Sequence, residues 1–358
     1  MKELTLATAF CFGFALLFLS GFLNIDDHQY VAFGQNETSS NSTITIPTTI
    51  SKEAQNALIN ITTQMPEFVN PGPDDLKGWG ELNKQVSAMS IAQSQSLVDN
   101  FKPNITSTRL GDVNVLDIKP KNWIDNGKVL VYVHGGGYTI LGANSTLNNS
   151  VPMANATGLR VMSVDYSLAP SSKWNEITSE VVSVIKALKE KGISLENIAM
   201  YGDSAGGGLV ASSVLKMRDE GIGIPAALVL WSPWTDVSGA GDTHSTLKNS
   251  DPFIPEPVLK NMGGAYANIS DQKNPYVSPV YGNFSKGFSP TLIQVGTKEI
   301  LLSDSIRLYQ ALDQAGIPVK LDVYEGMPHV FQTTLYKTPE STLAISKTVE
   351  FLKKYLKD

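Results

Sequence analysis

The residues best suited to chemistry are in Gly202-Asp-Ser-Ala-Gly206, which places a serine between two glycines. A short apolar run beginning at Ile198 precedes this turn, and apolar residues at helical spacing follow it as far as Met217. A strand, a Gly-x-Ser-x-Gly turn and a helix together expose a nucleophilic serine on a strained turn. Because the short pattern also arises by chance, Ser204 becomes a candidate nucleophile only if the chain supplies its partners.

A glycine loop, His134-Gly135-Gly136-Gly137, directly follows an apolar run of strand length. Successive glycines let the backbone approach a substrate closely and direct N–H groups at one point. Such donors stabilise the negative charge that develops on a carbonyl oxygen during acyl transfer, together with the N–H of the residue after the nucleophile, here Ala205. A simple tight turn is the alternative explanation. The pairing of this loop with the serine turn, in the right chain order, favours an oxyanion hole.

A serine nucleophile needs a general base, which a carboxylate in turn orients. The chain has four histidines. His28 lies in the N-terminal segment, His134 opens the glycine loop, and His244 lies in an irregular stretch. His329 follows the last predicted strand through a short loop, which would return it over the end of a sheet. We therefore predict His329 as the base.

The orienting acid is expected in the loop after the predicted strand Thr291–Val295, where Glu299 and Asp304 compete. Glu299 lies nearer the end of the strand, where a loop residue can reach the histidine. Asp304 stands where the next helix, Ser305–Gln314, is expected to begin, so N-capping would explain it without catalysis. We predict Glu299 as the acid and keep Asp304 as the alternative.

The elements that must position these residues alternate between strand and helix patterns. Continuous apolar runs of strand length suit strands buried on both faces. They occur at Lys128–Val133, Arg160–Asp165, Ile198–Gly202, Ala226–Trp231, Pro290–Val295 and Val319–Tyr324. Thr108–Ile118 alternates instead, which predicts one half-exposed strand at an edge. Strands alternating with helical patterns predict an α/β fold with a mostly parallel, twisted sheet flanked by helices.

The chain resembles the hormone-sensitive-lipase-like group of α/β-hydrolases, which are bacterial and archaeal carboxylesterases with an N-terminal cap. The resemblance covers about residues 51–356. It rests on His134–Gly137, Asp165–Pro170, Gly202–Gly206, Ser232–Asp236 and Gly326–Phe331.

This resemblance implies an α/β-hydrolase fold with Ser204 as nucleophile and His329 as base. It also implies that Gly136, Gly137 and Ala205 supply the N–H groups of the oxyanion hole. The chain departs from the group where many members have Asp-Pro-Leu and this sequence has Glu299-Ile-Leu301. The departure puts the identity of the acid in question, and not the class of enzyme.

Composition limits the classes of partner. The chain has 358 residues, 42 % of them apolar, a net charge of −6 and a pI near 5.3, without a basic stripe. These values suit a large globular domain and argue against a nucleic-acid partner. The single cysteine, Cys11, lies in the N-terminal segment, so disulfides and cysteine catalysis are excluded from the rest. No metal or organic cofactor is expected.

The domain organisation follows from an apolar N-terminal run, Leu4–Ile25. It predicts a signal peptide or membrane anchor over residues 1–34 and an extracytoplasmic protein, with membrane contact only through an uncleaved segment. Residues 35–50 are rich in Asn, Ser and Thr and are expected to form a polar linker. Residues 51–358 are expected to form the hydrolase domain, with cap segments at about 51–100 and 237–275.

Together these features predict a serine carboxylic-ester hydrolase that forms an acyl-enzyme on Ser204 and acts on short-to-medium acyl esters. A lactone hydrolase or an amidase of the same fold is an alternative, because all three reactions pass through similar tetrahedral intermediates. A ligand-binding protein that has kept the fold and lost catalysis is a further alternative. The presence of serine, acid, histidine and glycine loop disfavours it.

Overall fold

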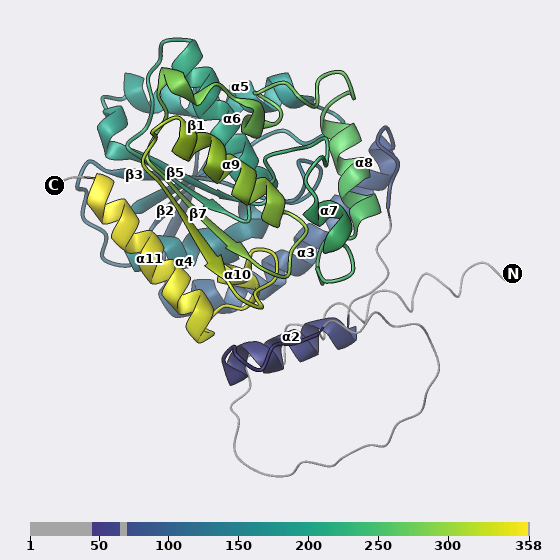
Figure 1. Ribbon diagram of the computed structural model, residues 1–358. Helices are drawn as coiled ribbons and strands as arrows, with labels where there is room; N and C mark the ends of the chain where they lie inside the picture. Colours follow the sequence, from purple (N-terminus) through teal and green to yellow (C-terminus); the bar gives the residue numbers. More distant parts are fainter. Residues whose placement is uncertain (1–44, 65–69, 357–358) are drawn as a thin grey trace, which may run out of the picture.

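The computed structural model describes residues 45–64 and 70–356 (Figure 1). The predicted signal peptide or anchor over residues 1–34, and most of the linker predicted over 35–50, lie outside the described residues. Within the described ranges, no helix is both long and apolar enough to cross a membrane.

The described residues form an eight-stranded sheet in the order β1-β2-β4-β3-β5-β6-β7-β8. Strand β2 pairs antiparallel with β1 and β4, and every other neighbouring pair is parallel. This arrangement confirms the predicted mostly parallel α/β sheet. The strands are β1 (Asn104–Leu110), β2 (Val113–Lys119), β3 (Val129–Val133), β4 (Arg160–Asp165), β5 (Ile198–Asp203), β6 (Ala227–Trp231), β7 (Thr291–Gly296) and β8 (Val319–Tyr324).

The prediction of one edge strand over Thr108–Ile118 is wrong, because the chain reverses inside this range. Strands β1 and β2 form a hairpin in which Leu110 lies opposite Val113. Gly111 has a φ of +58°, which a glycine adopts without a steric penalty and which suits a two-residue hairpin turn. The alternating pattern continues through this turn, so the pattern alone did not reveal the reversal.

Helices cover both faces of the sheet because successive side chains of a strand point to opposite faces. Val131 of β3 belongs to the core under α5, α6 and α9, whereas its neighbour Leu130 belongs to the core under α4 and α11. Figure 1 shows these two layers of helices on either side of the sheet. The longer helices are α2 (Lys52–Gln64), α3 (Leu76–Phe101), α4 (Leu147–Thr157), α5 (Trp174–Glu190), α6 (Ala205–Asp219), α8 (Glu256–Tyr266), α9 (Leu302–Gln314) and α11 (Pro339–Tyr355).

Short helical turns lie in the connections between these elements. They are η2 (Ala143–Thr146), η3 (Leu195–Asn197), α7 (Thr243–Thr246), η4 (Pro279–Tyr281), η5 (Phe284–Lys286) and α10 (Phe331–Thr334).

The first segment predicted as cap begins with α2, whose first turn is capped by Ser51. The Ser51 hydroxyl accepts a hydrogen bond from the amide of Ala54 at 3.1 Å. Leu58 of this helix is buried in a cluster that includes Met327 and Phe331. Helix α2 therefore packs against residues that lie before and after His329 in the chain.

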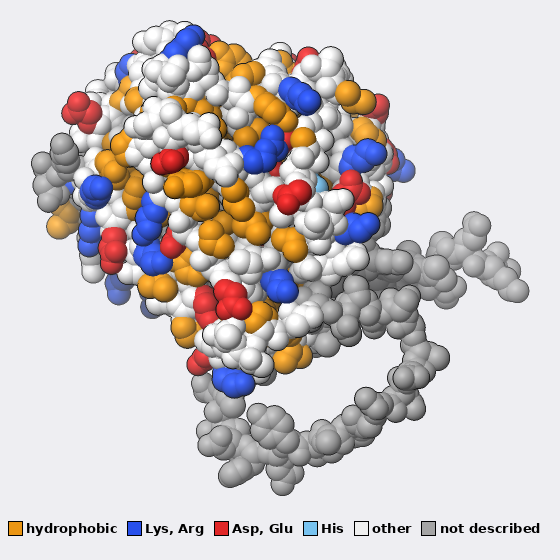
Figure 2. Space-filling view, viewed as in Figure 1, with side chains coloured by type: hydrophobic (Ala, Val, Ile, Leu, Met, Phe, Trp, Pro, Cys, Tyr) orange, Lys and Arg blue, Asp and Glu red, His pale blue; other side chains and the backbone are white. Residues whose placement is uncertain are grey.

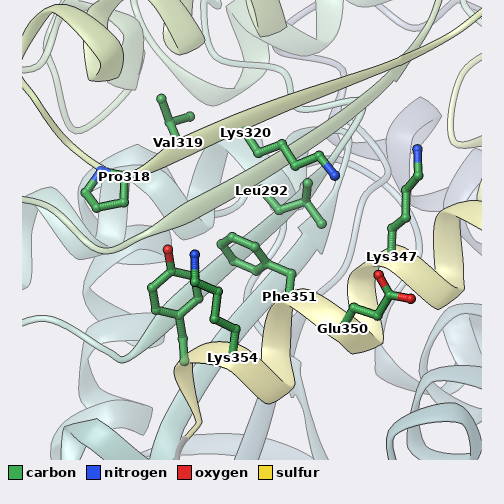
Figure 3. Close-up of a pocket in the computed structure, with 9 residues that line it drawn as sticks. Leu292, Pro318, Val319, Lys320, Lys347, Glu350, Phe351 and Lys354 are labelled. Carbon is green, nitrogen blue, oxygen red and sulfur yellow. The ribbon is translucent and has the colours of Figure 1, made fainter.

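A surface groove of about 380 Å³ lies between β8 and α11 (Figure 3), lined in part by Leu292, Val319, Lys320 and Phe351. Leu292 and Val319 stand at the beginnings of β7 and β8. The groove therefore lies at the amino ends of these strands, away from the loops that follow their carboxyl ends. On the face shown in Figure 2, basic and acidic side chains are interspersed, and neither sign dominates that face.

Candidate active site

The candidate site lies at the carboxyl ends of the parallel strands. Strands β3, β5, β6, β7 and β8 run parallel, so their carboxyl ends meet there. His134, Ser204 and Ser232 directly follow β3, β5 and β6, and Glu299 and His329 lie in the loops after β7 and β8. The fold thus brings together residues that are far apart in the chain.

Ser204 sits on a strained turn between β5 and α6. Its φ is +54° and its ψ is −125°, a conformation that residues with a side chain rarely adopt. Its amide donates to Trp231 O and its carbonyl accepts from Trp234 N, both at 2.9 Å. A Cβ at Gly206 would lie 2.1 Å from Val133 O, so the turn requires a glycine there. This is the geometry expected of a serine held out at the end of a strand.

Glu299 and His329 form a buried pair. His329 Nδ1 lies 2.9 Å from Glu299 Oε2, and Glu299 is completely buried. The other carboxylate oxygen, Oε1, accepts hydrogen bonds from Gly296 N at 2.6 Å and from Ser232 Oγ at 2.9 Å. When Nδ1 donates to the carboxylate, the neutral imidazole keeps Nε2 free to accept a proton. Across the described ranges no hydrogen bond links Ser204 to His329. Catalytic hydrogen bonds are often long before substrate binds and shorten in the complex.

The acidity of His329 reflects opposing effects. Burial by itself lowers the pKa of the imidazole, because it disfavours the charged form. The hydrogen bond to Glu299 and the negative charges of Glu299, Asp251 and Asp203 act in the other direction and outweigh burial, so the net pKa of His329 is raised. The site therefore stabilises an imidazolium.

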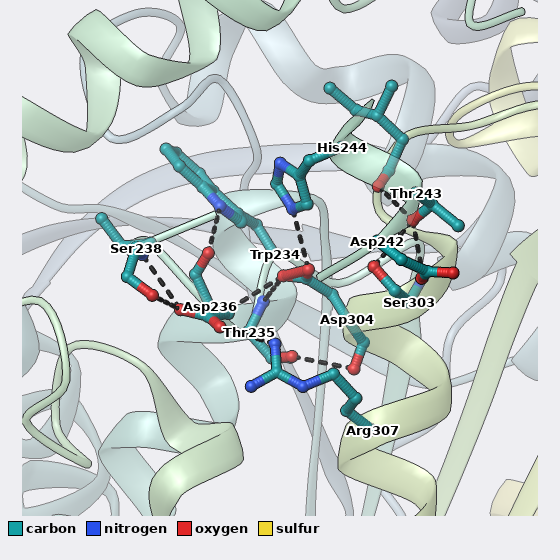
Figure 4. A network of polar contacts seen from close by, with 12 residues as sticks. Trp234, Thr235, Asp236, Ser238, Asp242, Thr243, His244, Ser303, Asp304 and Arg307 are labelled. Carbon is teal, nitrogen blue, oxygen red and sulfur yellow. Dashed lines mark hydrogen bonds and ion pairs between the residues drawn. The ribbon is translucent and has the colours of Figure 1, made fainter. Parts of the chain in front are cut away.

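Asp304, the alternative acid, has other partners (Figure 4). Its Oδ2 accepts from the amides of Thr235 at 3.1 Å and Asp236 at 2.8 Å, and its Oδ1 lies 3.0 Å from His244 Nε2. The expectation that it caps a helix is wrong, because α9 begins at Leu302 and Asp304 lies inside its first turn. The structure therefore pairs Glu299, and not Asp304, with His329.

The glycine loop is closely packed. Gly136 and Gly137 have φ values of +105° and +60°. A Cβ at Gly136 would lie 2.2 Å from Ile140 O, and a Cβ at Gly137 would lie 2.1 Å from the sulfur of Met262 in α8. Neither position tolerates a side chain without a shift of its neighbours. The loop is therefore held with its backbone uncovered by side chains of its own.

The remaining predicted residues lie around this loop, and Gly135 links it to the serine turn. The amide of Gly135 donates to Asp203 Oδ1 at 3.3 Å. Ala205 is the first residue of α6, where amides lack carbonyl partners within the helix. His134 is completely buried and stacks on Tyr166 with 4.0 Å between ring centroids. Burial lowers the pKa of His134, so its ring is neutral and packs in the core.

Ser232 is a residue of the site for which the sequence suggested no role. It is completely buried and has a φ of +46°. Its hydroxyl donates to Glu299 Oε1 at 2.9 Å and accepts from the amide of Val330 at 3.0 Å. One side chain thus connects the acid to the residue after His329. The sequence signal that could have identified Ser232 is its position directly after the buried strand β6.

Among the residues that the structure describes, no group of three or more His, Cys, Asp or Glu side chains is arranged to hold a metal ion.

Comparisons with known proteins agree with this arrangement. The α/β-hydrolase fold family matches residues 130–333. The chain is 32 % identical over 247 residues to an acetyl-hydrolase of Streptomyces hygroscopicus, covering 68 % of this chain and 82 % of that protein. It is 30 % identical over 225 residues to an esterase of Acinetobacter venetianus, covering 63 % and 74 % of the two chains. The crystal structure of an esterase from the bacterial hormone-sensitive lipase family superposes with a TM-score of 0.75 at 27 % identity, covering 86 % and 99 %.

Proposed function

The chain belongs to the α/β-hydrolase fold family and is a carboxylesterase, and from this premise we propose that it cleaves esters through an acyl-enzyme on Ser204. The Ser204 hydroxyl attacks the ester carbonyl while His329 Nε2 accepts its proton. The imidazolium then gives this proton to the departing alcohol. Water, deprotonated by the same nitrogen, attacks the acyl carbonyl carbon. The bond between this carbon and Ser204 Oγ then breaks, the imidazolium returns the proton to Oγ, and the carboxylic acid leaves.

The observation that carries this proposal is the 2.9 Å hydrogen bond between Glu299 and His329. Both residues lie after the carboxyl ends of parallel strands, as the strained Ser204 does. Glu299 holds the proton on Nδ1 and balances the charge of the imidazolium. Its own hydrogen bonds from Gly296 N and Ser232 Oγ keep the carboxylate in place.

The amides of Gly136, Gly137 and Ala205 are proposed to bind the oxyanion of the tetrahedral intermediate. Their support is the positive φ of Gly136 and Gly137, which carry no side chains of their own, and the position of Ala205 in the first turn of α6. Fixed donors of this kind stabilise charge where it develops, without reorganisation during the reaction.

Short-to-medium acyl esters are the proposed substrates. The side chain of Met262 packs against Gly137, so α8 limits the space beside the proposed oxyanion hole. The name of the Streptomyces relative, an acetyl-hydrolase, points in the same direction. A series of aryl esters with acyl chains of increasing length tests this part, and we expect kcat/KM to fall for long chains. Lactones and amides in the same panel test the alternative activities.

The decisive test is Ser204→Ala together with labelling by a fluorophosphonate. We expect kcat to fall on the order of 10⁶-fold and labelling of Ser204 to disappear, as in other serine hydrolases. Ser213→Ala is a matched control, because Ser213 is a fully buried serine of α6 whose hydroxyl has no hydrogen-bond partner. Retention of most activity by Ser204→Ala would refute the mechanism. A folded wild-type protein that resists the label would instead support a ligand-binding protein without catalysis.

An extracytoplasmic location is part of the proposal and is supported by the apolar run Leu4–Ile25 alone. Fractionation of cells that express the full chain tests it. We expect the protein outside the cytoplasm, either released or attached through this segment. Recovery in the cytoplasm would contradict this.

A further inference from the structure

The segment between β6 and β7 contacts two loops of the candidate site. We call residues 237–275 the cap insertion. Its helix α8 contacts the glycine loop, because Met262 packs on Gly137 and Tyr266 stacks on Tyr138 with 3.7 Å between ring centroids. A separate part of the insertion, around Asp251, contacts the loop of the acid.

Asp251 ties the insertion to the acid loop through its carboxylate. Its Oδ1 accepts hydrogen bonds from the amides of Phe253 at 2.8 Å and Ile254 at 3.1 Å, which shapes the insertion itself. Its Oδ2 accepts from the amide of Ile300 at 3.0 Å. Ile300 directly follows Glu299, so this bond fixes the peptide that carries the acid.

The charge of Asp251 also acts on the base. The groups that face Asp251 are His329 and Glu299, and those that face His329 are Glu299, Asp251 and Asp203. Burial raises the pKa of Asp251 to about 6, so it is largely ionised at neutral pH. The negative charge of Asp251 adds to that of Glu299 and Asp203 and stabilises the imidazolium that forms when the serine is deprotonated.

We propose that Asp251 is a positioning residue of the esterase, which holds the acid loop against the cap insertion through the amide of Ile300 and adds to the negative charge that acts on His329. The proposal rests on the function proposed for Ser204, Glu299 and His329. Through the hydrogen bond between Asp251 and the amide of Ile300, the cap insertion would take part in positioning the acid for the chemical step.

Asp251→Asn tests this role through the pH profile of kcat/KM and the separate values of kcat and KM. Asparagine has nearly the same size, but it lacks the charge and cannot accept on both sides. We expect kcat to fall roughly 10- to 100-fold with KM changed less than about threefold. We also expect the acid limb to move to lower pH by about half a unit to one unit, because His329 loses a neighbouring negative charge.

Asp117→Asn is the matched control, since Asp117 is a buried carboxylate on β2 that pairs with Arg160 at 2.7 Å and with Lys119 at 3.4 Å. It should lower thermal stability and leave the acid limb in place. An unchanged kcat and acid limb in Asp251→Asn would overturn the proposal. If that variant does not fold, Asp251→Glu replaces it. The acid limb should then stay while kcat falls, and a wild-type kcat would overturn the positioning role.

Labelling of the wild-type protein by a fluorophosphonate separates the two hypotheses. If Ser204 does not react, the proposed function itself fails. If Ser204 reacts and Asp251→Asn behaves as the wild type, only the role of Asp251 fails.

Discussion

Glu299→Gln is the most informative substitution, because the hydrogen bonds around this carboxylate allow an amide no good orientation. Glu299 Oε1 accepts from Gly296 N and Ser232 Oγ, and Oε2 accepts from His329 Nδ1. If the amide oxygen stays with the first two donors, the amide NH₂ faces Nδ1. The imidazole must then carry its proton on Nε2, where it cannot accept the proton of Ser204.

The opposite orientation is also unfavourable, since the NH₂ group would face the amide of Gly296 and leave a buried donor unpaired, at about 1–3 kcal/mol. We therefore expect the wrong tautomer to dominate. The corresponding change in a Ser-His-Asp protease lowers kcat about 10⁴-fold, so we expect about 10³- to 10⁴-fold here, or about 4–5.5 kcal/mol of transition-state stabilisation.

The assay is kcat on a short-chain aryl ester, normalised to active sites titrated with a fluorophosphonate. Asp304→Asn is the control. Because Asp304 pairs with His244 and two backbone amides, that variant should melt at lower temperature while its kcat per active site stays within about threefold. A fall of less than tenfold for Glu299→Gln, or an equal loss in both variants, would refute the assignment of the acid.

Four further predictions follow from the same geometry. The acid limb of kcat/KM should have its midpoint above about 6.5, the usual pKa of histidine, since the pKa of His329 is raised and only the neutral ring accepts a proton; a midpoint below 6 contradicts this. Ser232→Ala should lower kcat roughly 10- to 100-fold with little change in KM, because Glu299 loses a buried donor, and a wild-type kcat would remove Ser232 from the site. Gly136→Ala should fold poorly or lose about 10²- to 10³-fold in kcat, as followed by circular dichroism and turnover, since its Cβ would meet Ile140 O at 2.2 Å. Leu58→Ala should reduce the free energy of unfolding by about 2–4 kcal/mol in urea, and an unaffected stability would show that α2 is not packed on the body.

The sheet and the candidate residues were readable from the sequence because they depend on local patterns. Strands buried on both faces appear as continuous apolar runs, and the serine turn needs glycines at fixed positions. The hairpin of β1 and β2 was missed because its turn at Gly111 did not interrupt the alternating pattern.

The contacts between loops were not readable, since they depend on strand register and on how the insertion folds back. Ser232 reaches Glu299 because Trp231 of β6 lies opposite Gln294 of β7. Asp251 reaches Ile300 only after the chain has passed through α8 and returned along β7. The start of α9 was misplaced for a related reason, because the carboxylate of Asp304 binds amides of another loop and not those of its own helix.

Two serines, Ser204 and Ser232, stand side by side at the ends of neighbouring strands in backbone conformations that cost about 1–3 kcal/mol each. Glycine at position 204 would relieve this cost, so that replacement should make the fold more resistant to heat. Glycine at position 232 would relieve it as well, but it would remove the buried hydroxyl that donates to Glu299 Oε1 and accepts from the amide of Val330, which offsets the gain. Each replacement would also delete a hydroxyl on which the proposed reaction depends. A library selected for thermal stability alone should therefore accumulate inactive proteins with glycine at position 204, whereas a screen that includes ester turnover should retain Ser204.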